Sequence, residues 1–252
     1  PPPPPILNRD GSKKYVRAVE SNRAKYHRLR YENRQRQADK SQEYSDMLET
    51  LKDVMRRYAI FGEVEQLSEF GNTREGLVDA RKTVMDMLEQ RGSIMDEGIL
   101  VNTLSGLDVS EGNVTFIGSQ GFSVGNKPAG APLLITSASQ TMPIEDLTAS
   151  SIKAFADANV VEMELTQGYV GVSVDGDSVT LTMNHPVPEV YKENLIKFAE
   201  REGMPSIYSS VDGEVIPVTD NPTYKGIGRR DAVVDAVADL KRNKMPVRKN
   251  VK

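Results

Sequence analysis

The stretch that decides the fold is residues 12–59, which read SKKYVRAVESNRAKYHRLRYENRQRQADKSQEYSDMLETLKDVMRRYA. It contains no Gly or Pro and is rich in residues that favour a helix, with Ser12 placed to cap the first turn. In its second half, apolar side chains recur every three or four residues, at Tyr44, Met47, Leu48, Leu51, Val54, Met55 and Tyr58. This spacing predicts one long helix whose second half is buried against the rest of the chain.

The first half of this helix is strongly basic. Residues 13–40 carry ten Lys or Arg against three acids, a net charge of +7, and their apolar side chains form no continuous stripe. A helix that is polar on all sides must bridge between bodies, lie on a partner or stay partly unfolded, and we expect this half to project. Arg binds phosphate and carboxylate through its planar fork of donors. The candidate partner- or phosphate-binding residues are the interleaved arginines and tyrosines, Arg23, Tyr26, Arg28, Arg30, Tyr31, Arg34 and Arg36.

Charge is segregated along the whole chain. Residues 229–252 carry eight basic residues and three acids, whereas residues 41–228 carry 13 basic residues and 29 acids, so the net charge of −4 combines basic ends with an anionic body. Arg229 and Arg230 follow a Gly-Ile-Gly segment at the predicted start of the last helix, and they are further candidates for binding a phosphate. This asymmetry predicts an acidic partner for the ends, either nucleic acid or the body of another copy.

The elements predict an α+β fold, with a long N-terminal helix and helical hairpin followed by a mainly antiparallel sheet with packed helices. We expect a Pro-rich arm at 1–11, the basic helix and hairpin at 12–97, a β-rich, loop-rich segment at 98–142, an α+β domain at 143–243 and a basic tail at 244–252. In the hairpin, Ile60-Phe61-Gly62 ends the long helix. Asn72 then caps a second helix, which Gly92 ends and which packs antiparallel to the first.

The second half of the chain shows strand and turn signals. Strands are predicted at Ile99–Leu104, Val114–Ile117, Leu133–Thr136, Val160–Leu165, Tyr169–Val174, Ser178–Met183, Ser206–Val211 and Glu214–Val218. Asp175-Gly176 and Asp212-Gly213 are hairpin turn signals. Helices are predicted over 143–158, 187–201 and 230–242, and we expect them on one face of the sheet.

The sequence offers little for catalysis. It has no Cys and only two His, His27 and His185, which lie far apart in the chain. Ser150 and Lys153 have the Ser-x-x-Lys spacing of serine acyl-enzymes, but the companion motifs are absent. We therefore expect no enzyme, no metal site and no cofactor. The alternative, an enzyme whose site forms between subunits, would bring His185, Ser150 and Lys153 together in one cleft.

Composition and charge favour assembly over chemistry. No apolar run reaches the roughly 18 residues of a membrane-spanning helix, so we expect no membrane partner and a cytoplasmic or virion location. The expected function is a non-enzymatic structural component of a large multisubunit complex, such as a phage-like virion, that docks on other subunits as a homo-oligomer or larger assembly. The alternative is a nucleic-acid-binding protein that contacts phosphates through the basic helix 13–40 and the basic tail.

Overall fold

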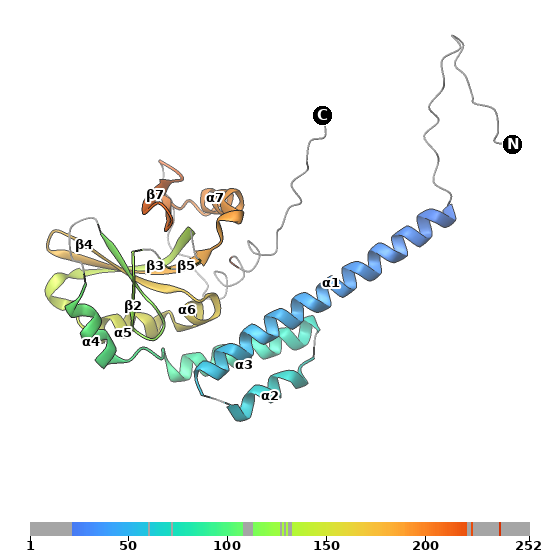
Figure 1. Ribbon diagram of the computed structural model, residues 1–252, viewed down its shortest axis with the longest axis horizontal. Helices are drawn as coiled ribbons and strands as arrows, with labels where there is room; N and C mark the ends of the chain where they lie inside the picture. The colour runs from blue at the N-terminus through green and yellow to red at the C-terminus, as the bar shows by residue number, and fades with distance from the viewer. Residues whose placement is uncertain are drawn as a thin grey trace, which may run out of the picture.

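A long helix projects from an α+β body (Figure 1). The computed structural model describes residues 22–59, 61–71, 73–107, 113–126, 133–220 and the single positions 128, 130, 223 and 237. Several predictions fall outside these residues. They are the arm at 1–11, the Ser12 cap, the tail at 244–252 and all of the last helix except Val237, which is buried against α7.

The predicted long helix is confirmed as α1 (Asn22–Arg57), whose 36 residues span about 54 Å at 1.5 Å per residue. Two more helices follow, α2 (Phe61–Glu69) and α3 (Arg74–Arg91). The predicted stripe of α1 is buried in a core shared with both, through Leu51, Val54, Leu67 and Leu88. The second half of α1 is therefore held by the hydrophobic effect, as its spacing predicts.

The predicted antiparallel hairpin is wrong. Phe61 begins a helix rather than a loop, because Val64 and Leu67 bury one side of α2 against the same core. α2 carries the chain back, so α3 runs parallel to α1, and the Tyr58 hydroxyl at the end of α1 donates to the Gly92 carbonyl at the end of α3 at 2.9 Å. The N-cap of α3 is Thr73, not Asn72, since the Thr73 side chain accepts from the Gly76 N–H.

Seven strands form one antiparallel sheet in the order β2-β1-β4-β5-β3-β6-β7. They are β1 (Val114–Ile117), β2 (Ser123–Gly125), β3 (Leu133–Pro143), β4 (Tyr169–Asp175), β5 (Ser178–Val187), β6 (Ser206–Ser209) and β7 (Glu214–Pro217). Both predicted hairpins are confirmed, with Gly176 and Gly213 at positive φ in their turns. The sequence signals missed the short β2 and the second half of β3.

The sheet is strongly curled. Phe116 on β1 and Tyr208 on β6 are separated by β4, β5 and β3, which would place them about 19 Å apart in a flat sheet. Their ring centroids lie 5.5 Å apart. The face that carries these two rings is therefore the inside of the curl, where Leu134 and Tyr169 join them.

The remaining helices cover the outer face of the sheet, as predicted. α4 (Glu97–Ser105), α5 (Ala149–Ala158) and α6 (Val160–Thr166) lie over one part of it, where Leu181 packs with Ile152. α7 (Lys192–Arg201) covers the other part, where Val187 packs with Leu195. Leu181 and Val187 are both on the same side of β5, because side chains alternate along a strand. Two 3₁₀ turns, η1 (Ile144–Asp146) and η2 (Glu189–Tyr191), precede α5 and α7, so the helices predicted from 143 and 187 begin later.

Two predicted strands are helices. Ile99–Leu104 lies in α4, where the Asp96 carboxylate caps the first turn by accepting from the Ile99 N–H at 2.9 Å. Val160–Leu165 lies in α6, which is buried on nearly all sides. Val160 and Val161 pack into the core of α1, α2 and α3, whereas Met163 packs into the core of the sheet. A helix between two cores has apolar residues all round, so its sequence lacks the helical period.

Candidate functional site

The first half of α1 stands clear of the body. We define the arm as residues 25–40 of this helix. Its described side chains are exposed, except for the half-buried Glu32. Contact with the body begins only at Tyr44 and Met47, which are partly buried against the helical core. Figure 1 shows this part of α1 extending beyond α3 into solvent.

The arm carries most of the predicted site residues. The arm contains six basic residues and two acids, so its net charge is +4. The basic residues are Lys25, Arg28, Arg30, Arg34, Arg36 and Lys40, and the acids are Glu32 and Asp39. Arg28 is paired with Glu32 at 3.7 Å, whereas the other five cations make no ion pair within the part of the chain that the structure describes. The backbone of Arg23 is part of α1, just before the arm. Arg229 and Arg230 lie outside the described residues, so they are not brought to this site.

The arm also exposes three large apolar side chains. Tyr26 is 60%, Leu29 45% and Tyr31 62% exposed. At about 100° per residue, Tyr26 and Leu29 lie roughly 60° apart, whereas Tyr31 is about 160° from Leu29, on the opposite side. The arm therefore offers apolar contacts in two directions, with cations around them, and this suits a partner that surrounds it.

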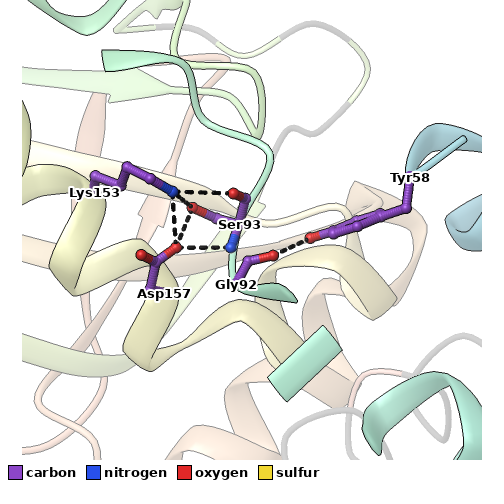
Figure 2. Close-up of polar contacts among 5 residues, drawn as sticks. All are labelled: Tyr58, Gly92, Ser93, Lys153 and Asp157. Carbon is purple, nitrogen blue, oxygen red and sulfur yellow. Dashed lines mark hydrogen bonds and ion pairs between the residues drawn. The ribbon is translucent and has the colours of Figure 1, made fainter. Parts of the chain in front are cut away.

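A polar cluster joins the helical part to the sheet part (Figure 2). Asp157 on α5 accepts from both the N–H and the hydroxyl of Ser93, at 2.7 and 2.6 Å. The ammonium of Lys153 lies 3.2 Å from the same carboxylate oxygen and donates to the Ser93 carbonyl at 3.1 Å. Partial burial alone would raise the pKa of Asp157, but the hydrogen bonds from Ser93 and Lys153 outweigh it and hold that pKa below its ordinary value.

The cluster holds the segment that follows α3 against α5 through the contacts of Ser93 with Asp157 and Lys153. The Ser-x-x-Lys pairing considered from the sequence does not occur within the described residues, because the Lys153 ammonium donates to the Ser93 hydroxyl and Ser150 is exposed.

A second set of contacts fixes the C-terminal end of α1. Arg57 donates to the carboxylate of Glu164 on α6 at 2.8 Å and to its backbone carbonyl at 3.1 Å. The Glu164 side chain is fully buried, and its second carboxylate oxygen has no hydrogen-bond partner among the described residues. Burial raises the pKa of Glu164, against the opposing effect of Arg57. Together with the Tyr58–Gly92 hydrogen bond, these contacts anchor α1 at its C-terminal end.

Sequence reasoning missed a buried chain of hydroxyls around His185. The imidazole Nδ1 lies 2.6 Å from the Thr166 hydroxyl, and Nε2 lies 2.6 Å from the Ser137 hydroxyl. Thr166 donates to the Glu162 carbonyl, which assigns the ring proton to Nδ1 and leaves Nε2 to accept from Ser137. His185 is opposite Ile135 in the register of β3 and β5, and a bulge between Thr136 and Ala138 brings the Ser137 hydroxyl within reach of the His185 ring. Nothing in the sequence marks this bulge.

The His185 chain is closed to solvent. His185 is fully buried, and Ser137 and Thr166 are more than nine-tenths buried. The ring nitrogens of His185 contact Ser137 and Thr166, whereas Lys153 contacts Ser93 and Asp157 and Ser150 is exposed, so these hydrogen bonds do not join the three residues of the enzymatic alternative. The arrangement resembles an activated serine in its hydrogen bonds, but all three side chains are buried.

The described residues show neither a metal-binding cluster nor a membrane-spanning helix. They contain no group of three or more His, Cys, Asp or Glu placed to hold a metal ion. None of their helices combines the length and the apolar character required to cross a membrane.

Comparison with known proteins adds no relative. No family model, no curated protein and no solved structure matches the chain. Function is therefore inferred from the arm, the two polar clusters and the distribution of charge.

Proposed function

We propose that this protein is a non-enzymatic structural subunit of a large multisubunit assembly, such as a virus particle, and that it docks on protein neighbours through the arm. The observation that carries the proposal is the exposure of the arm on all sides, with five of its six cations unpaired within the described residues. The projecting part of this helix is polar on all sides, so it has no apolar face to bury and adds little to the stability of its own fold.

The side chains of the arm are those that anchor interfaces. Tyr and Arg are enriched at protein–protein contacts, where an aromatic ring fills a pocket and a guanidinium pairs with a carboxylate. Tyr26 and Tyr31 are exposed on different sides of the helix, Tyr26 just before Arg28 and Tyr31 between Arg30 and Arg34. The partner that fits this pattern has acidic and apolar groups on more than one side of a groove.

Nucleic acid is the second candidate partner, and the unpaired arginines are the observation that favours it. Phosphate contacts release counterions, so the logarithm of the binding constant would fall with the logarithm of salt concentration by about 0.9 per contact on duplex DNA. The exposed Leu29 and the two tyrosines on different sides favour a protein partner, because a duplex offers phosphates rather than apolar pockets around a helix.

The test compares the full chain with two variants. The arm variant carries Arg30→Gln and Arg34→Gln. The control variant carries Lys82→Gln and Lys197→Gln, which lose the same two positive charges at exposed positions of α3 and α7. Sedimentation velocity over a wide concentration range should show that the wild type and the control variant self-associate or retain a partner, whereas the arm variant stays monomeric.

Two results would contradict the proposal. One is a wild-type chain that stays monomeric at the highest attainable concentration and recovers no protein partner. The other is equal association by the arm variant and the control variant. Retention of DNA or RNA that weakens steeply with salt, and that the arm variant loses, would instead support the nucleic-acid function.

A further inference from the structure

We infer that the arm docks on a second copy of this chain, at the acidic end of its sheet; this inference rests on the proposed function. The acidic end is defined by Ile144, Glu145, Asp146, Asp175 and Asp177. The Ile144 N–H donates to the Asp177 carbonyl at 2.9 Å, which holds η1 beside the β4–β5 turn. All four carboxylates are exposed, and none of them makes an ion pair within the described residues.

The acidic end matches the arm in more than charge. Ile144 is 37% exposed among the four carboxylates, and Met142 beside it is half-buried. The arm has the reciprocal composition, with Tyr26 and Leu29 exposed among cations. An apolar centre within a charged rim is the usual arrangement of a protein–protein interface. Opposite charge on the two rims favours encounter of arm and acidic end and disfavours contact between two arms.

The geometry requires two copies. In Figure 1 the β4–β5 end of the sheet lies at the left of the longest axis, and the free end of α1 lies at the right. The contacts of Arg57 and Tyr58 anchor the other end of α1, so the arm cannot fold back onto the acidic end of its own chain. A contact between two different surfaces is heterologous, and its repetition gives a ring if the rotation closes or an open filament if it does not.

Two neutralising variants test this contact. The arm variant, Arg30→Gln with Arg34→Gln, removes charge from one side. The end variant, Asp175→Asn with Asp177→Asn, removes it from the other and keeps a turn, because Asn-Gly is also a favoured hairpin turn. A matched acidic control carries Asp79→Asn and Asp86→Asn on the exposed face of α3.

The expected result is that the dissociation constant for self-association rises at least about tenfold in the arm variant and in the end variant, and not in the acidic control. A factor of ten corresponds to about 1.4 kcal/mol. Mixing the two interface variants should restore association, because the intact arm of the end variant meets the intact acidic end of the arm variant. The mixture should stop at a dimer, because its remaining arm and acidic end are both neutralised.

The outcomes separate this inference from the proposed function. If the arm variant loses association and the end variant keeps it, the arm docks elsewhere and the inference is overturned while the proposed function stands. If neither variant loses association, the arm is not the docking element and both fall. If each variant loses association but the mixture stays monomeric, the contact is not heterologous and the inference is wrong.

Discussion

Replacing Asp157 with Ala tests whether the Ser93–Lys153–Asp157 cluster holds the two parts of the body together. The change removes one carboxylate that accepts two hydrogen bonds from Ser93 and pairs with Lys153. A hydrogen bond to a charged group contributes about 1.5–3 kcal/mol, and this carboxylate is 38% exposed, so water replaces part of the loss. We expect a loss of about 2 kcal/mol in the free energy of unfolding, which corresponds to a fall of roughly 4–8 °C in Tm for a chain of this size.

The assay is thermal and urea unfolding followed by circular dichroism, with Asp86→Ala on the exposed face of α3 as the matched control. The pKa of Asp157 is lowered in the folded state, so its stabilisation is present above the ordinary value of 3.8 and is lost as pH falls through the folded pKa. The wild type should therefore exceed the variant in the free energy of unfolding by the whole expected amount at neutral pH, and this difference should shrink toward zero in acid. A Tm equal to that of the Asp86→Ala control, or a difference that does not change in acid, would refute the reasoning.

Two further changes test the buried polar groups. His185→Ala should lower the free energy of unfolding by about 3 kcal/mol or more, because it leaves a cavity and deprives the Ser137 and Thr166 hydroxyls of their partner. Urea unfolding measures this loss. A change below about 1 kcal/mol would show that the Ser137–His185–Thr166 hydrogen bonds contribute little to stability. Glu164→Gln should gain stability relative to wild type as pH rises above the ordinary value of 4.5. Burial raises the pKa of Glu164 in the folded state, so the wild type loses stability as pH rises through that pKa. If the difference in Tm between Glu164→Gln and wild type stays the same across this pH range, the expectation is wrong.

The sequence predicted the parts of the fold that depend on local pattern. The apolar spacing from Tyr44 to Tyr58 predicted the buried half of α1, because only one face of that helix meets the core. Asp175-Gly176 and Asp212-Gly213 predicted two hairpins, because each pair supplies a glycine that adopts positive φ in the turn. In each case the deciding signal lies within a few residues of the element it predicts.

The failures come from tertiary context. α6 has four apolar residues within six positions, Val160, Val161, Met163 and Leu165, because it lies between two cores, and the alternation from Val161 to Leu165 also suits a strand. A signal for α4 was present in Asp96, which is placed to cap a helix that begins at Glu97. No local signal could place Ser137 beside His185, because their distance depends on a bulge and on the register between β3 and β5.

The sequence predicts one part of the candidate site and not the other. The arm could be predicted from composition alone, because a basic helix without an apolar stripe has no face to bury. The acidic end could not, since Glu145 and Asp146 meet Asp175 and Asp177 through the register of β3 with β5, in which Pro143 is opposite Ser178, and through the hydrogen bond between η1 and the β4–β5 turn. Segregation of charge along the chain was visible in the sequence, but its segregation in space required the fold.

The arm depends on the body for both its helical state and its direction. Starting a helix is costly, whereas extending one adds a hydrogen bond for each residue fixed. The buried stripe that includes Leu51 and Met55 supplies the stable turns, and the Arg, Lys and Gln of the arm extend them. Arg57 and Tyr58 then fix the axis against α6 and the end of α3, so any partner that binds the arm is held at a set orientation to the sheet. Weakening these contacts should therefore disturb the geometry of an assembly more than the affinity of a single docking event.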